Sequence, residues 1–279
     1  MKRGEGFGLA GLIGWPVAQS RSPAIHNYWM ERYGLEGRYV LLPVAPGRLE
    51  AALRGLPALG FRGGNVTMPY KRAVMPLLDA VDATARRVGA VNTITVLADG
   101  TLLGTNTDAA GYLASLREAA PGWRGDAGPS VVLGAGGAAR AVVAALIEAG
   151  AREIRVLNRT AAHAERLAEL GGPVAVFDWA NRADVLADAA LLTNATSLGM
   201  TGKPALELSL GRLAPGALVS DLVYAPVETP LLAGARARGN PVVGGLGMLL
   251  HQAVPAFEAW FGVRPEVTPE LHRAVLATF

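Results

Sequence analysis

The stretch from Ser130 to Ala139, with the sequence SVVLGAGGAA, decides the fold of this chain. A short apolar run precedes a glycine-rich turn, and the residues that follow predict a helix over 138–149. A strand, a Gly-x-Gly-x-x-Ala turn and a helix in this order form a dinucleotide-binding fingerprint, in which glycine permits a tight turn and lets the backbone approach a pyrophosphate. The helix N-terminus then presents free N–H groups and a positive dipole end to the phosphates. We therefore expect a dinucleotide on Gly134, Ala135, Gly136, Gly137 and Ala138; the alternative is a glycine-rich turn without a ligand.

Short apolar runs alternate with amphipathic stretches along the chain, which predicts an α/β fold with strands joined by helical crossovers. The length of 279 residues is typical of about two domains, and the glycine- and proline-rich segment 121–129 is typical of a linker. The predicted strands cover 9–14, 39–44, 63–68, 91–96, 101–105, 130–133, 153–157, 174–177, 191–195, 218–222 and 241–243, with a hairpin turn at 98–100. The predicted helices cover 22–32, 46–56, 73–88, 138–149, 161–170, 246–261 and 269–279.

The composition excludes several classes of protein. With no cysteine, the chain has no disulfide, thiolate zinc site, iron–sulfur cluster or cysteine nucleophile, and we expect no metal. The formal net charge is only +3 and no basic cluster is interleaved with aromatic residues, so we expect no nucleic-acid partner. No run of 18 apolar residues lacks a charge, so no membrane span is expected. Lys2 and Arg3 before the apolar run 7–15 weakly resemble a signal peptide, but Glu5 and several glycines interrupt that pattern, so we expect a cytoplasmic protein.

Lysine is rare in this chain. Only Lys2, Lys71 and Lys203 stand among 26 basic residues, and all the others are arginine. An arginine cannot serve as a base, since its pKa exceeds about 12, whereas a lysine amine can exchange a proton. Lys71, which ends the polar segment 65–71, is therefore a candidate for proton transfer.

The end of the second strand after the fingerprint indicates which dinucleotide binds. NAD sites usually place an acidic residue there, on the ribose 2′-hydroxyl. Here the residues are Asn158, Arg159 and Thr160, and none of them is acidic. Arg159 can pair with a 2′-phosphate and its two neighbours can add neutral hydrogen bonds, so we expect NADP. The alternative is that Arg159 only covers the start of a helix.

Four polar segments follow or precede predicted strands in the first half: 19–22, 65–71, 90–93 and 106–108. Their hydroxyls, amides, one lysine and one aspartate suit a small polyhydroxylated ligand, and Ser20 and Ser22 near a helix N-terminus suit a carboxylate. Each residue also has a purely structural interpretation. Ser22 and Asp108 are also candidates for helix caps, and Asn65 and Asn92 for turn residues.

Together these segments resemble the shikimate dehydrogenase family over nearly the whole chain. The similar stretches are GWPVAQSRSP (14–23) with His26 and Asn27, NVTMPYK (65–71), GAVNT (89–93), GTNTD (104–108), GAGGAAR (134–140), NRT (158–160), NATSLGM (194–200), DLVY (221–224) and GGLGMLLHQA (244–253).

The resemblance implies a fold of two domains, an N-terminal α/β substrate domain and a Rossmann-type dinucleotide-binding domain, with the C-terminal helices returning to the first. The substrate domain would cover 1–110 plus about 246–279, and the NADP domain 111–245. The chain would interconvert 3-dehydroshikimate and shikimate, a precursor of aromatic amino acids, as a monomer or homodimer.

The resemblance also implies roles for single residues. Ser20 and Ser22, with Tyr224, would hold the substrate carboxylate. Thr67, Asn92 and Gln252 would bind ring hydroxyls, with Asn65 supporting, and Lys71 and Asp108 would be the catalytic pair. The cofactor would also contact Thr196, Leu222, Gly245 and Met248. Burial favours a neutral Lys71 and a paired Asp108 favours a charged one, so the residue that carries the proton stays open.

One position departs from the family pattern. Where the family often has a second arginine near the 2′-phosphate, this chain has His163, so the preference for NADP over NAD is open. The resemblance further implies shikimate rather than quinate, because serine stands at both position 20 and position 22. The alternatives are a quinate or shikimate dehydrogenase of mixed cofactor use and a non-catalytic NADP-binding regulatory module.

Overall fold

The computed structural model describes residues 6–279, which form two compact units. Unit 1 comprises residues 6–107 and 250–279 of the described chain, and unit 2 comprises Asp108–Leu249. Helix α8 (Gly245–Phe261) contains the second boundary, so its first five residues belong to unit 2 and the rest to unit 1. Lys2 and Arg3 of the signal-like segment lie outside the described residues. No helix within 6–279 combines the length and the apolar character that a membrane crossing needs.

Unit 1 is built on a six-stranded sheet in the order β2-β1-β3-β5-β6-β4. The strands are β1 (Gly8–Gly14), β2 (Gly37–Pro43), β3 (Phe61–Val66), β4 (Ala80–Val81), β5 (Thr93–Val96) and β6 (Leu102–Thr105). β1 runs parallel to both β2 and β3, whereas β5 pairs antiparallel with β3 and β6. The sheet is therefore mixed, and the predicted hairpin at 98–100 is confirmed.

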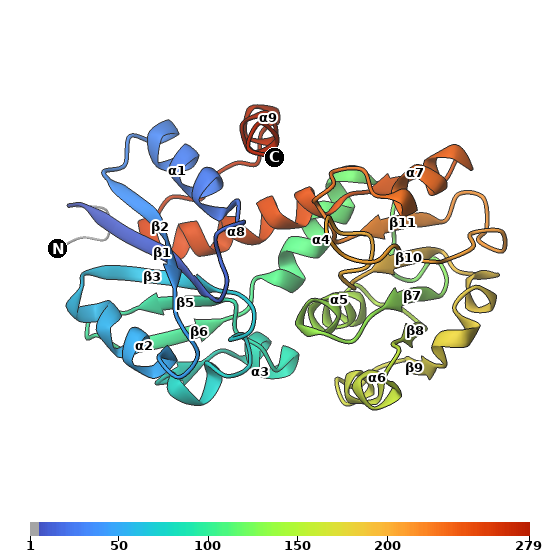
Figure 1. The fold of residues 1–279 in the computed structure, drawn as a ribbon, viewed down its shortest axis with the longest axis horizontal. Helices are drawn as coiled ribbons and strands as arrows, with labels where there is room; N and C mark the ends of the chain where they lie inside the picture. Colours follow the sequence, from blue (N-terminus) through green and yellow to red (C-terminus); the bar gives the residue numbers. More distant parts are fainter. Residues whose placement is uncertain (1–5) are drawn as a thin grey trace. The chain divides into compact units, whose positions relative to one another are not determined.

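The helices of unit 1 cover both faces of this sheet. They are α1 (Ser22–Arg32), α2 (Leu49–Ala58), α3 (Ala83–Val88), α9 (Pro269–Leu276) and the unit 1 part of α8, with the 3₁₀ turn η1 (Met75–Leu77). α1 and α2 lie on opposite faces of the sheet (Figure 1). Leu53 and Leu56 of α2 pack with Ile13, Val66 and Ile94 of the strands. On the α1 side lies an aromatic cluster of His26, Trp29, Tyr39, Phe257, Trp260 and Phe261.

Two local predictions for unit 1 are wrong. The predicted helix over 73–88 is split into η1, β4 and α3, because Pro76 lies in η1 and the Asp82 side chain starts a new helix by accepting from Ala85 N–H at 2.6 Å. Ser22 is not the N-cap of α1, since Arg21 occupies that position and makes no side-chain capping bond. The hydroxyl of Ser22 is instead bonded to that of Ser20, at 3.2 Å.

Unit 2 has a six-stranded, wholly parallel sheet in the order β12-β11-β10-β7-β8-β9. The strands are β7 (Ser130–Leu133), β8 (Ile154–Leu157), β9 (Val174–Phe177), β10 (Leu191–Asn194), β11 (Leu218–Asp221) and β12 (Val242–Val243). The helices are α4 (Asp108–Ala119), α5 (Gly137–Glu148), α6 (Ala161–Ala168) and α7 (Pro230–Ala237), with 3₁₀ turns η2 (Trp179–Asn181) and η3 (Asp184–Leu186). The strand order reverses between β7 and β10, which in open α/β sheets is where ligands bind.

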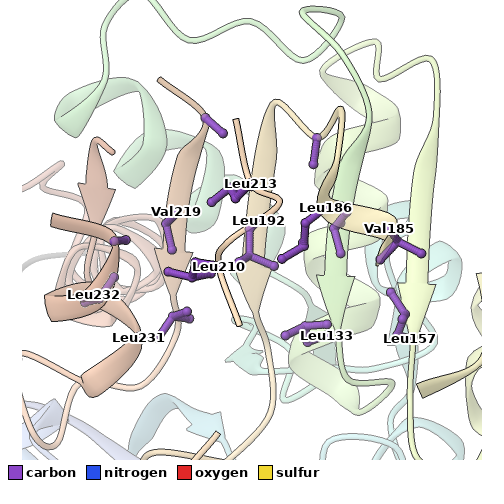
Figure 2. Packing of buried hydrophobic residues seen from close by; sticks show 14 residues of the cluster. Leu133, Leu157, Val185, Leu186, Leu192, Leu210, Leu213, Val219, Leu231 and Leu232 are labelled. Atoms are coloured by element: carbon purple, nitrogen blue, oxygen red, sulfur yellow. The ribbon is translucent and has the colours of Figure 1, made fainter. Parts of the chain in front are cut away.

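One face of this sheet is closed by leucines and valines from non-adjacent segments. Figure 2 shows side chains of four strands, Leu133, Leu157, Leu192 and Val219, meeting Leu186, Leu210 and Leu231 from η3, the 206–213 segment and α7. α5 packs against β7 and α4. These buried contacts fix the carboxyl ends of β7, β8, β10 and β11, where the predicted cofactor residues lie.

Candidate active site

The turn after β7 has the geometry of a nucleotide-binding loop. Gly134 has φ +108°, which side-chain-bearing residues rarely adopt, and its N–H donates to the carbonyl of Leu157 at 2.7 Å. A Cβ here would lie 2.9 Å from the carbonyl oxygen of Ala195 and 3.0 Å from Thr196 Cγ2. Glycine at position 134 therefore lets the loop after β7 approach the loop after β10.

The start of α5 faces open space. Gly136 is the N-cap of this helix and its backbone is extended; apart from its two chain neighbours, no atom of residues 6–279 lies within 4 Å of the place where its Cβ would be. The helix begins at Gly137, followed by Ala138, so its first two residues carry no side chain larger than a methyl group. A phosphate can approach these groups and the positive end of the helix dipole.

The segment after β8 carries the residues predicted to select NADP. Asn158 Nδ2 donates to the carbonyl of Thr160 at 2.9 Å, and Thr160 is the N-cap of α6 without a side-chain capping bond. Arg159 is exposed and forms no ion pair with any of residues 6–279, which leaves its guanidinium available for an anion. His163, also exposed, stands in the first turn of α6.

A buried carboxylate, Asp221 at the end of β11, organises the neighbouring loops. It is 1% exposed, and it accepts from Asn194 Nδ2 at 2.9 Å, Val223 N–H at 3.0 Å and Thr229 Oγ1 at 2.7 Å. Burial raises the pKa of Asp221, and the bonds from Thr229, Val223 and Asn194 oppose that rise. The carboxylate thereby ties β10, β11 and the start of α7 together.

Asn194, which is held by Asp221, in turn fixes the position of Thr196, a predicted cofactor residue. Asn194 Oδ1 accepts from the backbone N–H and the hydroxyl of Thr196, at 3.1 and 2.7 Å, and Thr196 Oγ1 accepts from Leu198 N–H at 3.0 Å. We did not predict roles for Asn194 and Asp221 from the sequence. The available signal was that each polar residue ends a buried strand.

The other predicted cofactor residues lie at the same end of unit 2. Leu222 N–H donates to the carbonyl of Asn194 at 2.9 Å. A Cβ on Gly245 would lie only 2.3 Å from the carbonyl oxygen of Leu222, so glycine lets α8 start against the end of β11. Met248 follows in the first turns of α8, and Tyr224, predicted to hold the substrate carboxylate, is half-buried after β11.

In unit 1 three of the predicted substrate residues, Asn65, Asn92 and Gln252, share one connected polar network. Asn65 Nδ2 donates to the carbonyl of Asn92 at 3.2 Å and to Thr93 Oγ1 at 3.1 Å. Asn92 Nδ2 donates to Thr107 Oγ1 at 2.9 Å, and the Thr107 hydroxyl reaches the carbonyl of Gln252 in α8 at 2.8 Å. Asn65 and Asn92 are 4% and 1% exposed, so neither is the surface turn residue that the sequence left open.

Three further predicted substrate residues, Thr67, Ser20 and Ser22, lie after strands of the same sheet. Thr67 directly follows β3, and its N–H donates to the carbonyl of Ile13 at 2.9 Å. The two serines lie between β1 and α1, where Ser22 N–H donates to Ser20 Oγ at 3.2 Å. The residue pair is thus preorganised, with its hydroxyls side by side.

The two predicted catalytic residues fall into different units. The carbonyl of Lys71 accepts from Val91 N–H at 2.8 Å, which places the Lys71 backbone beside the segment that carries Asn92. Asp108 is 5% exposed and is the first residue of α4 in unit 2, directly after Thr107. The pairing of Lys71 with Asp108 stays a prediction.

Three family models match the chain. The shikimate dehydrogenase substrate binding domain matches residues 12–94, the shikimate/quinate 5-dehydrogenase model 127–199, and the shikimate 5′-dehydrogenase C-terminal domain 245–269.

Three proteins similar to this chain in sequence and fold carry names that agree with these family models. A curated shikimate dehydrogenase (NADP(+)) from Paramagnetospirillum magneticum is 57% identical, over 96% of this chain and 98% of that protein. The structure of shikimate 5-dehydrogenase from Thermus thermophilus with NADP(H) and shikimate has 38% identity and a TM-score of 0.86, covering 98% of this chain and all of that one. Quinate dehydrogenase from Corynebacterium glutamicum with NAD has 35% identity and a TM-score of 0.91, with coverages of 98% and 100%. The chain belongs to the shikimate dehydrogenase family.

Proposed function

We propose that this protein is an NADP-dependent enzyme that interconverts shikimate and 3-dehydroshikimate. The observation that carries the proposal is the 57% identity, over 96% of the chain, to a curated shikimate dehydrogenase (NADP(+)). The polar network of unit 1 and the glycine-rich turn of unit 2 supply the two kinds of binding group that such a reaction needs.

The residues at the carboxyl end of the unit 2 sheet fit a dinucleotide. Gly134 to Ala138 and the start of α5 would hold the pyrophosphate, and Asn158, Arg159 and Thr160 the 2′-phosphate. Thr196, Leu222, Gly245 and Met248 would line the remainder of the cofactor site. The bound NADP⁺ supplies the hydride acceptor, and the exposed Arg159, which has no carboxylate partner within residues 6–279, supports a preference for the phosphorylated form.

The substrate would bind at the carboxyl ends of β1 and β3. Ser20 and Ser22, joined by a 3.2 Å hydrogen bond, would hold the carboxylate together with Tyr224. Thr67, Asn92 and Gln252 would bind the ring hydroxyls. Asn65 would support them from within the buried network, whose fixed donors and acceptors lose little freedom on binding.

Lys71 and Asp108 would handle the proton of the alcohol that is oxidised. Oxidation of a secondary alcohol sends a hydride to the cofactor and a proton to a base, and both an amine and a carboxylate can accept that proton. The two groups would act as one coupled pair. Their presence argues against a regulatory module that has lost its chemistry.

The domain assignment is part of the same proposal. Residues 1–110 with about 246–279 would bind substrate, and residues 111–245 would bind NADP. We further propose a cytoplasmic protein that is a monomer or a homodimer.

A steady-state assay of shikimate and quinate, each with NADP⁺ and NAD⁺, tests the proposal. We expect the highest kcat/KM for shikimate with NADP⁺. The solved quinate dehydrogenase with a TM-score of 0.91 makes quinate with NAD⁺ the second candidate, and a higher kcat/KM for that pair would replace our proposal. Absence of shikimate-dependent NADP⁺ reduction would overturn it.

A further inference from the structure

The Tyr39 side chain is hydrogen-bonded to the side-chain amide of Asn65. Tyr39 is in β2, is 2% exposed, and its hydroxyl donates to Asn65 Oδ1 at 2.8 Å. The amide nitrogen of Asn65 donates to the carbonyl of Asn92 and to Thr93 Oγ1. A flipped Asn65 amide would set its NH₂ group against the Tyr39 hydroxyl and its oxygen against the carbonyl of Asn92. Because the Asn92 carbonyl can only accept, the Asn65 nitrogen faces it, and the Tyr39 hydroxyl supplies the donor to the Asn65 oxygen in that orientation.

Backbone hydrogen bonds and ring contacts both fix the position of Tyr39. Its backbone N–H donates to Asn27 Oδ1 at 2.9 Å, and its carbonyl accepts from Asn27 Nδ2 at 3.1 Å. The His26 ring is stacked on the Tyr39 ring, with centroids 4.2 Å apart and planes 8° from parallel. Trp260 closes a further side, at 6.0 Å between centroids. Movement of the phenol away from Asn65 would break the stacking on His26 and the contact with Trp260.

The Tyr39 hydroxyl remains a hydrogen-bond donor at all physiological pH values. Burial raises the pKa of Tyr39, and a hydrogen bond with the Ser22 hydroxyl opposes that rise only in part. The same phenol thus adjoins two residues with predicted substrate roles, Ser22 for the carboxylate and Asn65 for the ring hydroxyls.

We infer that Tyr39 is a positioning residue of the substrate site, which fixes the Asn65 amide and through it the Asn92 segment. The inference rests on the proposed function, because the roles of Asn65, Asn92 and Ser22 come from it. A phenylalanine would fill the same space in the core, so packing alone does not require the hydroxyl. The hydroxyl donates to the buried Asn65 oxygen, which a phenylalanine ring could not do.

Tyr39→Phe tests this inference, because it removes the hydroxyl and keeps the ring. Loss of a buried hydrogen bond that preorganises the site predicts that KM for shikimate rises about 5- to 30-fold. We expect KM for NADP⁺ to stay within about twofold and kcat to fall less than KM rises, since Tyr39 holds binding groups that act before the chemical step.

Tyr112→Phe is the matched control. Tyr112 is a second buried tyrosine, 1% exposed, and its hydroxyl is 2.6 Å from Thr193 Oγ1 in unit 2. Both variants lose one buried phenolic hydrogen bond, so they lower the unfolding midpoint to a similar degree. Only Tyr39→Phe is expected to raise KM for shikimate, and an equal rise in both variants would overturn the inference.

A double-mutant cycle with Asn65→Ala tests whether Tyr39 acts on shikimate binding through Asn65. If Tyr39 acts through Asn65, Tyr39→Phe adds no further rise in KM once Asn65 is alanine, whereas fully additive effects would contradict us. If Tyr39→Phe does not fold, Asn65→Ala alone decides, because an unchanged KM for shikimate overturns the inference. A wild-type enzyme inactive with shikimate refutes the proposed function and this inference with it; an active wild type with an unaffected Tyr39→Phe refutes the inference alone.

Discussion

Asn194 Nδ2 donates to Asp221 Oδ1 at 2.9 Å, and this bond joins the ends of the adjacent strands β10 and β11 beneath the candidate cofactor loops. Asp221→Ala would remove the acceptor of the Thr229 hydroxyl and of the Val223 N–H, and one of the two acceptors of the Asn194 amide, which also donates to the carbonyl of Leu198. We expect a loss of about 2–4 kcal/mol in the free energy of unfolding and a higher KM for NADP⁺.

Urea unfolding and NADP⁺ titration measure these two effects. Asp184→Ala is the control, because Asp184 is exposed and its ion pair with Arg212 spans 3.4 Å, a type of contact worth less than about 1 kcal/mol. Equal stability losses in the two variants would refute the importance we assign to the buried carboxylate.

Arg159→Ala tests the 2′-phosphate site. A charge-assisted hydrogen bond to the phosphate predicts that KM for NADP⁺ rises about 10- to 100-fold, while KM for NAD⁺ changes little. Arg212→Ala, which removes another exposed arginine of unit 2, should change neither value. Parallel changes for both cofactors in Arg159→Ala would remove the argument for phosphate recognition.

Lys71→Ala tests proton transfer. Loss of a group that exchanges a proton in the transition state predicts a fall in kcat of about 10²–10⁴-fold, with a smaller change in KM for shikimate. Lys203, exposed in the loop after β10, provides a matched control, since Lys203→Ala removes the same side chain from a site without a predicted role. A Lys71→Ala enzyme with near-native kcat would show that this amine does not carry the proton.

The stability of the fold should depend on His26 as pH falls. Burial lowers the pKa of His26 from 6.5 to about 3, and the nearby Asn65 amide offsets only part of this effect. Between these values the unfolded chain binds a proton that the folded chain does not, so stability is full above pH 6.5 and declines below it. By pH 5 the loss from this one group is about 2 kcal/mol.

His26→Phe should remove this component of the pH dependence. We expect the difference in unfolding free energy between pH 7 and pH 5 to shrink by about 2 kcal/mol relative to wild type. The raised pKa of Asp221 acts in the opposite direction, but it is common to both proteins and cancels in the comparison. An unchanged pH dependence in His26→Phe would contradict the assignment.

Helices, strands and turns of both units could be predicted well from the sequence where the residues that determine the element are neighbours in the chain. The turn at Gly134, the hairpin at 98–100 and the bounds of α1 follow from neighbouring residues. The predicted helix over 73–88 failed because Pro76 and the cap at Asp82 override its apolar pattern.

Contacts between distant segments could not be predicted from local patterns. Tyr39 and Asn65 are 26 positions apart, and Asn194 and Asp221 are 27 apart, so their bonds exist only once the strands are in register. Asn65 and Asn92 illustrate the same limit. Both are consistent with turn residues in the sequence, and only the sheet shows that they are buried.

The boundary inside α8 has a consequence for the order of folding. Unit 2 is continuous in sequence, whereas unit 1 is completed by residues 250–279. Trp260, whose indole N–H donates to the carbonyl of Ile94 at 2.9 Å, is synthesised long after the strand it closes. During synthesis unit 2 has all of its strands before unit 1 has its last aromatic residues. During synthesis unit 2 can therefore fold first, and unit 1 becomes complete only after residues 250–279 have been added.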